Sequence, residues 1–474
     1  MQKHQLQRTI GLWTATSVVV GSVIGSGIFM RPSQMAGELG SPMMLLIVWV
    51  VAGLISMFGA MINAEFGAMF PQTGGQYIFL KVIYGEFFSF LFGWGCFAVI
   101  NTAGSCAIAF VFSQYLGYFF HLPDFSVETI NSFAFHVPFI GIISPLDNFG
   151  IKSLTILLVL FLTIINYFSV RWGGALQLFF TILKILTILF LVGGIFFFGH
   201  GTFHNFIQNS PTIHPQGFMM VAAFAAATTG AFMSYDGWNN ITFVAGEIKD
   251  PQRNIPRSLF YGMLICIVCY LLINQALLYV LPIDAIAGSK LVASDAMSTV
   301  LGTSGGAVIA AMVVISTFGC VNANLLAQAR VTFAMAEEKK FFHWAGIANP
   351  KFKTPGNALI LHLIWSLFLI LSGSFEILGD MFIFVTWIFY ACIAFGIFIL
   401  RKRMPDAERP YKVWGYPIIP IIFILFAAYY IFTTLYNDIT NYMDGKTHII
   451  NSVFGLVLTA IGIPLYFYFK RKKK

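Results

Sequence analysis

Long runs of apolar residues, separated by short polar segments, follow one another along almost the whole chain. Many of the runs approach the length of about 20 residues that a helix needs to cross the hydrocarbon core of a bilayer. The pattern predicts twelve transmembrane helices, with boundaries that can shift by several residues. They are expected over residues 11–36, 43–69, 86–119, 153–170, 174–199, 217–246, 257–281, 306–336, 357–373, 378–400, 415–436 and 448–469.

Small and polar residues interrupt the first apolar run. Residues 21–29 read Gly-Ser-Val-Ile-Gly-Ser-Gly-Ile-Phe, near the predicted middle of the membrane. A helix that breaks there exposes backbone N–H and C=O groups, which lipid cannot satisfy and a polar ligand can. For this segment alone, the simpler alternative is a helix-packing face, because Gly21 and Gly25 have GxxxG spacing.

A second interruption lies in the sixth apolar run, where residues 232–240 read Phe-Met-Ser-Tyr-Asp-Gly-Trp-Asn-Asn. Interrupted helices at corresponding places in two halves of a chain indicate a substrate site between inverted repeats. We therefore expect two repeats over residues 11–200 and 217–400, followed by two further helices over 415–469. An acid is costly in a continuous membrane helix, but Asp236 can cap a helix that restarts after a break.

Composition and charge agree with a multi-pass membrane protein. Hydrophobic residues make up 58% of the chain and charged residues only 10%. Most Lys and Arg residues fall at one set of predicted helix ends, and such residues stay on the cytoplasmic side during insertion. We therefore expect residues 1–10 and the basic tail 470–474 to be cytoplasmic, with no cleavable signal before the first helix. The net charge of +8 then reflects topology and contact with the lipid bilayer, and nucleic acid is not an expected partner.

The residues that carry enzyme chemistry are sparse. Of nine histidines only His362 lies well inside a predicted helix, and no HExxH-type motif occurs. All six cysteines fall within predicted helices, where cysteine packs as a small apolar residue. We expect no enzyme, no cofactor and no metal site. A channel filter is also not evident, and a transporter-like nutrient sensor is disfavoured because neither end carries a sizeable soluble segment.

Several motifs together resemble the amino acid-polyamine-organocation superfamily, and within it the L-type amino acid transporter branch. They lie at residues 21–29 with Pro32, 64–77, 166–170, 245–257, 318–330, and 401 with 408–410. The resemblance implies an all-α membrane fold of 5+5 inverted repeats with discontinuous helices 1 and 6. It also implies a stand-alone transporter of a bacterial cytoplasmic (inner) membrane. The loop over 120–152 lacks the cysteine that links eukaryotic relatives to a glycoprotein heavy subunit.

The resemblance further implies a site that holds the charged head of an amino acid. The substrate carboxylate would accept from backbone N–H groups at the start of the second half-helix, where the helix dipole favours an anion. The ammonium would donate to carbonyl groups freed at the breaks. The positions expected to contribute are Val23, Ile24, Gly25, Ser26, Gly27 and Ile28 in the first break, and Phe232, Met233, Ser234, Asp236 and Gly237 in the second.

Side-chain preference must come from residues around that head. By resemblance these are Asn239, Cys320 and Thr386. The superfamily's gating aromatic aligns with Met233, whereas the aromatic residue of this chain is Phe232, one position earlier. We expect Met233 to close over the substrate as a lid. In the alternative, the break is displaced by one residue and Phe232 is the lid.

Lys184 lies near the middle of the fifth apolar run, far from water for a snorkelling side chain. The resemblance implies that this lysine takes the place of sodium in sodium-coupled relatives, bonding to the unwound part of helix 1 and to Ser316. The sequence thus predicts a sodium-independent exchanger of neutral L-amino acids that works by alternating access. A proton-coupled symporter remains the alternative, because a buried lysine can lose its proton.

Overall fold

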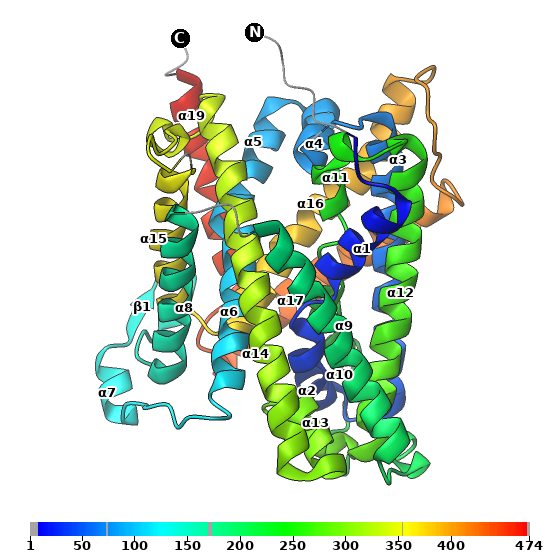
Figure 1. The fold of residues 1–474 in the computed structure, drawn as a ribbon, viewed down its shortest axis with the longest axis vertical. Helices are drawn as coiled ribbons and strands as arrows, with labels where there is room; N and C mark the ends of the chain where they lie inside the picture. The colour runs from blue at the N-terminus through cyan, green and yellow to red at the C-terminus, as the bar shows by residue number, and fades with distance from the viewer. Residues whose placement is uncertain (1–7, 73, 169–172, 353, 472–474) are drawn as a thin grey trace.

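The computed structural model describes residues 8–72, 74–168, 173–352 and 354–471, without the side chains of 173–179 and 181. The described chain is helical except for one antiparallel hairpin of β1 (Phe135–Val137) and β2 (Gly141–Ile143). Most long helices run along the long axis of the molecule, and the first and last described residues lie towards the same end of it (Figure 1). We call this the terminal end and the opposite one the far end.

Nine segments of the described chain are long and apolar enough to cross a membrane, and one bent helix pair makes a tenth. The nine are α3 (Pro42–Met69), Glu86–Leu116, α8 (Phe149–Phe168), Phe218–Phe243, α12 (Pro251–Val280), α14 (Val292–Glu337), α16 (Phe375–Arg403), α17 (Ile418–Met443) and Asn451–Arg471. Two apolar helices are shorter, Ile182–Phe198 within α9 (Gly173–Phe198) and α15 (Gly356–Ser372). The helical membrane protein is confirmed, while the count of twelve and the inverted repeats stay predictions.

Some of these segments contain more than one element. Segment Glu86–Leu116 consists of α5 (Glu86–Gly95), the π-helix η1 (Cys96–Ile100) and α6 (Asn101–Leu116). Segment Phe218–Phe243 contains α10 (Phe218–Tyr235) and α11 (Asn240–Phe243), and segment Asn451–Arg471 contains α18 (Asn451–Ala460) and α19 (Gly462–Arg471). Short elements lie outside them: α4 (Gly75–Tyr84), α7 (Val127–Ser132), η2 (Phe203–Phe206), η3 (Ala245–Glu247), α13 (Ile283–Gly288) and η4 (His343–Gly346).

The first apolar run folds as two helices, as its glycines predict. They are α1 (Leu12–Val23) and α2 (Gly27–Leu39), which meet at a bend of 45°. The intervening residues 24–26 are not helical. This first break therefore leaves the last carbonyl groups of α1 and the first N–H groups of α2 without partners inside their own helices.

The second break lies between α10 and α11, at residues 236–239. Gly237 has a φ of 101°, a conformation that residues with a side chain rarely adopt. A Cβ atom at Gly237 would lie 2.7 Å from the carbonyl oxygen of Ser22, so the glycine also lets this break approach α1. The break starts later than the predicted interval, because Phe232 to Tyr235 still belong to α10.

The helices form two groups with two helices between them. In the first group, which we call the break bundle, α3 packs along α12, α2 packs along α10, and α1 packs on α12. In the second group, the scaffold, α6, α8, α14 and α15 pack on one another. Helix α9 contacts α12 and α14, and α16 contacts α6 as well as α3 and α10. Both α9 and α16 thus connect the break bundle to the scaffold.

Candidate functional site

The two breaks touch each other inside the break bundle. A Cβ atom at Gly27 would lie 2.7 Å from Ser234 Oγ and 3.1 Å from Ser234 Cα. Any side chain at position 27 would therefore push α2 away from α10, since real Cβ contacts are rarely so short. The glycines at 27 and 237 bring the backbones of both half-helix pairs close enough to face one ligand.

The start of α2 offers unused backbone donors. Phe29 N–H donates to the Ser26 carbonyl at 3.1 Å. Across the described chain, the N–H groups of Ser26, Gly27 and Ile28 donate no backbone-to-backbone hydrogen bond between separate elements. Because the dipole of α2 favours negative charge at this end, the position suits a carboxylate.

Tyr270 of α12 links the two breaks through one hydroxyl group. Its oxygen lies 2.8 Å from the Val23 carbonyl oxygen and 2.8 Å from the Ser234 carbonyl oxygen. A hydroxyl carries a single proton, so it donates to only one of these carbonyls at a time. A donor with several protons, such as an ammonium group, can serve the other. Sequence reasoning missed Tyr270, because no motif marks a lone tyrosine in an apolar helix.

Lys184 of α9 lies close to the first break. Its ammonium nitrogen donates to the Gly21 carbonyl at 3.2 Å, in the last turn of α1, and the side chain is buried. Ser316 is also buried, on α14. The bond expected between Lys184 and Ser316 is not among the hydrogen bonds of the described residues, and the coupling role of the two residues stays a prediction.

Asp236 does not cap α11, and that prediction is wrong. The N-cap residue is Asn239, which makes no capping bond with its side chain. The chain is extended at Asp236, with ψ of 159°, so the carboxylate comes too early to reach the new helix start. It accepts a bond from the Tyr390 hydroxyl on α16 at 2.7 Å instead. None of the ion pairs in the described part of the chain gives Asp236 a basic partner.

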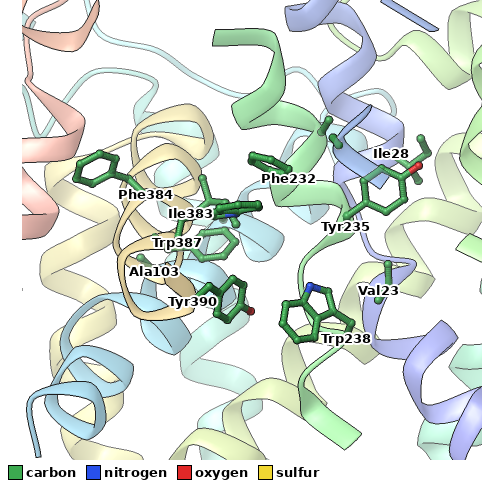
Figure 2. Close-up of a cluster of buried hydrophobic side chains, with 14 of the residues drawn as sticks. Val23, Ile28, Ala103, Phe232, Tyr235, Trp238, Ile383, Phe384, Trp387 and Tyr390 are labelled. Carbon is green, nitrogen blue, oxygen red and sulfur yellow. The ribbon is translucent and has the colours of Figure 1, made fainter. Parts of the chain in front are cut away.

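Phe232 and Met233 point to different neighbours. Phe232 stacks on Trp387 of α16 with ring centroids 3.7 Å apart, and Figure 2 shows the two rings together with Tyr390 below them. Met233 is only partly buried, and its sulfur lies 3.0 Å from Nε of Arg31 on α2. Phe232 is thus held in an aromatic cluster, while Met233 of α10 contacts Arg31 of α2. The choice of lid stays a prediction.

The three side chains expected around the pocket have different surroundings. Asn239 donates to Gln76 of α4 at 3.1 Å, and Gln76 donates in turn to Asn63 of α3 at 3.3 Å. Thr386 donates to a carbonyl of its own helix α16. Cys320 is half-buried on α14. No described hydrogen bond joins Cys320 or Thr386 to a break, whereas Asn239 is part of the second one.

A cavity of about 420 Å³ opens at the far end of the molecule. It is lined mainly by polar residues, among them Gln34, Glu38, Asp380 and Asp438. Arg31 lies one turn from Gln34 towards the break and is fully buried. A layer of side chains around Arg31 therefore separates this cavity from the breaks. Among the described residues, no three His, Cys, Asp or Glu side chains are placed to hold a metal ion.

Comparison with known proteins gives matches over most of both chains. The chain is 31% identical over 475 residues to the serine/threonine exchanger SteT of Bacillus subtilis (strain 168), covering 100% of this chain and 99% of that protein. It is 30% identical over 482 residues to the large neutral amino acids transporter small subunit 2 of Homo sapiens, covering 99% and 82%. It is 29% identical over 440 residues to the b(0,+)-type amino acid transporter 1 of Mus musculus, covering 92% and 85%.

The sequence model of one protein family also matches nearly the whole chain. The family is described as amino acid permease, and the match covers residues 10–459. That interval includes both breaks, Tyr270 and Lys184. The chain belongs to the amino acid permease family and is an amino acid transporter, not an enzyme.

Proposed function

We propose that this transporter is a sodium-independent exchanger of neutral L-amino acids, working by alternating access, with both termini in the bacterial cytoplasm. The contact of the Lys184 ammonium with the Gly21 carbonyl at 3.2 Å carries the proposal. The carbonyl end of a half-helix attracts a cation. A lysine that stays with the protein supplies this charge in every state, so the cycle needs no sodium ion.

Exchange and neutral substrates are supported by the relatives. One is named a serine/threonine exchanger and another a large neutral amino acids transporter. The cytoplasmic position of both termini is supported by the charge distribution, since most basic residues fall at the predicted helix ends on that side.

In the proposed site, backbone groups bind the part that all α-amino acids share. The carboxylate lies against the N–H groups of Ser26, Gly27 and Ile28. The ammonium donates to the carbonyl groups of Val23 and Ser234, taking whichever one Tyr270 leaves unpaired. Because this recognition ignores the side chain, the specificity must come from residues nearby, with Asn239, Cys320 and Thr386 as candidates.

One observation favours a second substrate class. The Asp236 carboxylate lies at the second break and has the Tyr390 hydroxyl, but no basic group, as its partner among the described contacts. A cationic side chain would pair with a partly buried carboxylate of this kind. Lysine and arginine are therefore the critical competitors for the proposal of neutral substrates.

A competition panel tests the substrate class. The purified full chain is reconstituted in liposomes loaded with unlabelled serine, and uptake of labelled serine is measured against each common amino acid outside. Small and large neutral amino acids are expected to compete, and lysine and arginine are not. Strong competition by arginine that disappears in Asp236→Asn would assign a cationic substrate and overturn the neutral one.

Counterflow tests the exchange mechanism. Labelled uptake should require an amino acid inside the liposomes and should not change with a pH gradient. Uptake into empty liposomes driven by an inward proton gradient would instead establish the proton symporter. A protein that binds amino acids but moves none under either condition would be a sensor.

A further inference from the structure

Helix α16 contacts the break bundle through polar side chains at three depths. Asp380 lies near its far end, Tyr390 near its middle and Arg401 at its terminal end. With a rise of 1.5 Å per residue, neighbouring contacts are roughly 15 Å apart along the helix axis. The middle contact is the bond from Tyr390 to Asp236 described above. The outer two are ion pairs to different helices of the break bundle.

The ion pair at the far end joins α2 to α16. Arg31 Nη2 lies 2.9 Å from Asp380 Oδ1, and the Arg31 side chain is 0% exposed. The same guanidinium contacts the Met233 sulfur and Gln34 Oε1, so it touches the outer parts of both broken spans. We call the Arg31–Asp380 pair the far latch.

Local packing adapts to the far latch. A Cβ atom at position 379 would collide with the Arg31 guanidinium, so Gly379 makes room for it. The guanidinium carbon also lies 4.7 Å from the centre of the Phe375 ring. Asp380 lines the cavity at the far end, while Arg31 is closed off beneath it. The far latch is thus part of the barrier between that cavity and the breaks.

The ion pair at the terminal end joins α3 to α16. Arg401 donates to Glu65 through two bonds, from Nε to Oε1 at 3.1 Å and from Nη2 to Oε2 at 2.7 Å. Glu65 also accepts from the Val413 N–H at 2.7 Å, and Arg409 Nε lies 3.5 Å from it. The carboxylate is 1% exposed. We call the Glu65–Arg401 pair the terminal latch.

We propose that the two latches are positioning residues of the transport cycle, and that together they set to which side of the membrane the site opens. The proposal rests on the proposed alternating-access function and adds the residues that control it. Opening a path from the far end to the breaks requires α2 to leave α16, which separates Arg31 from Asp380. Opening towards the terminal end requires α3 to leave α16, which separates Glu65 from Arg401.

Both latches are closed in this structure, so it shows neither path open. Removing one charge of a buried pair leaves the other charge uncompensated, which destabilises the closed form at that end. The population then shifts to the form that is open there. Because one helix carries both latches, weakening one must change the two sides of the membrane in opposite directions.

The test compares carboxylate-to-amide variants of similar shape, Asp380→Asn and Glu65→Gln, in liposomes with known protein orientation. The half-saturating serine concentration for exchange is measured separately from the far side and the terminal side. Asp380→Asn should lower it on the far side and raise it on the terminal side, each by about threefold or more. Glu65→Gln should do the reverse, and the double variant should return towards the wild-type ratio.

The matched control is Glu86→Gln, which removes an exposed ion pair with Lys81, and it should leave both values unchanged. Asp380→Glu restores the charge and should restore most of the wild-type ratio. If either amide variant does not fold, Arg31→Lys and Arg401→Lys weaken the same latches while keeping the charge. Values that move in the same direction on both sides, or not at all, would overturn the proposal. If wild-type protein moves no amino acid, the proposed function itself has failed.

Discussion

The absence of a Cβ atom at position 27 allows the two breaks to lie against each other. The backbone at Gly27 is helical, so the glycine is not needed for its own conformation. It is needed because Ser234 of α10 occupies the space that a side chain would fill. Helix packing depends on this missing Cβ, and so does substrate access in the proposed site.

Gly27→Val should abolish substrate binding, because the branched side chain displaces α10 and covers the N–H groups at the start of α2. Binding of labelled serine to purified protein measures this, with thermal unfolding as the check on folding. Gly37→Val is the matched control on α2, since no atom lies within 4 Å of a Cβ there, and it should bind normally. If Gly27→Val binds as the wild type does, the substrate site lies elsewhere.

The amino-acid sequence predicts part of this site at the level of single residues. Gly27 and Lys184 could be identified from the sequence because glycine and charged residues stand out in an apolar run. Both lie at or next to the breaks. Tyr270 could not be identified from the sequence, because tyrosine is common in membrane helices and its two carbonyl partners are determined by helix packing. Asp236 was misassigned, because the exact residue at which a helix restarts decides whether a side chain can cap it.

At the level of elements, α10 presents two different faces just before its break. Consecutive residues of a helix point about 100° apart. Phe232 faces the aromatic cluster with Trp387 of α16, and Met233 faces Arg31 of α2. The face with Phe232 packs in the aromatic cluster, and the face with Met233 contacts the layer of side chains around Arg31.

Phe232→Ala should lower stability, by about 3 to 5 kcal/mol for a buried aromatic side chain, with less effect on exchange by the protein that remains folded. Met233→Ala should mainly lower the exchange rate, because it removes the predicted lid and a contact of the far latch. Thermal unfolding and initial rates per folded protein separate the two effects. Met219→Ala, at an exposed position of the same helix, is the control. A larger loss of rate in Phe232→Ala would make Phe232 the lid.

The existence of both broken helices followed from the sequence, whereas their ends did not. Glycine and polar residues within an apolar run mark a break, because lipid does not tolerate free backbone groups. They do not mark its first residue, since Phe232 to Tyr235 fit the last turn of a helix as well as a loop. The π-helix η1 within the third apolar run left no sign in the hydrophobic pattern.

At the scale of the whole molecule, Lys184 connects α9 to the break bundle through the carbonyl of Gly21. A sodium ion in this place would have to bind and leave in each cycle. In the proposed mechanism the lysine instead stays with the protein, so we expect the transport cycle to depend on the amino acid alone.

Replacing sodium by choline should leave wild-type exchange unchanged. Lys184→Ala should impair exchange, because an unpaired buried carbonyl costs about 1 to 3 kcal/mol in the state that the bond stabilises. Exchange rates in both salts measure the effect. Lys446→Ala, which removes an exposed lysine paired with Asp444, is the control. A sodium requirement in the wild type would falsify the role of Lys184, and an unimpaired Lys184→Ala would leave it as a packing residue.

The hydroxyl of Tyr270 lies equally near two carbonyl groups, with one proton for both. An empty site is therefore always one donor short, whichever carbonyl the tyrosine serves. In the proposed site, a bound ammonium supplies the missing donor at the junction of the two broken helices, whose movement alternating access would require. The empty protein would thus face a higher barrier to reorientation than the loaded one. In the proposed exchanger, such an inequality would couple the inward and outward fluxes, one molecule out for each molecule in.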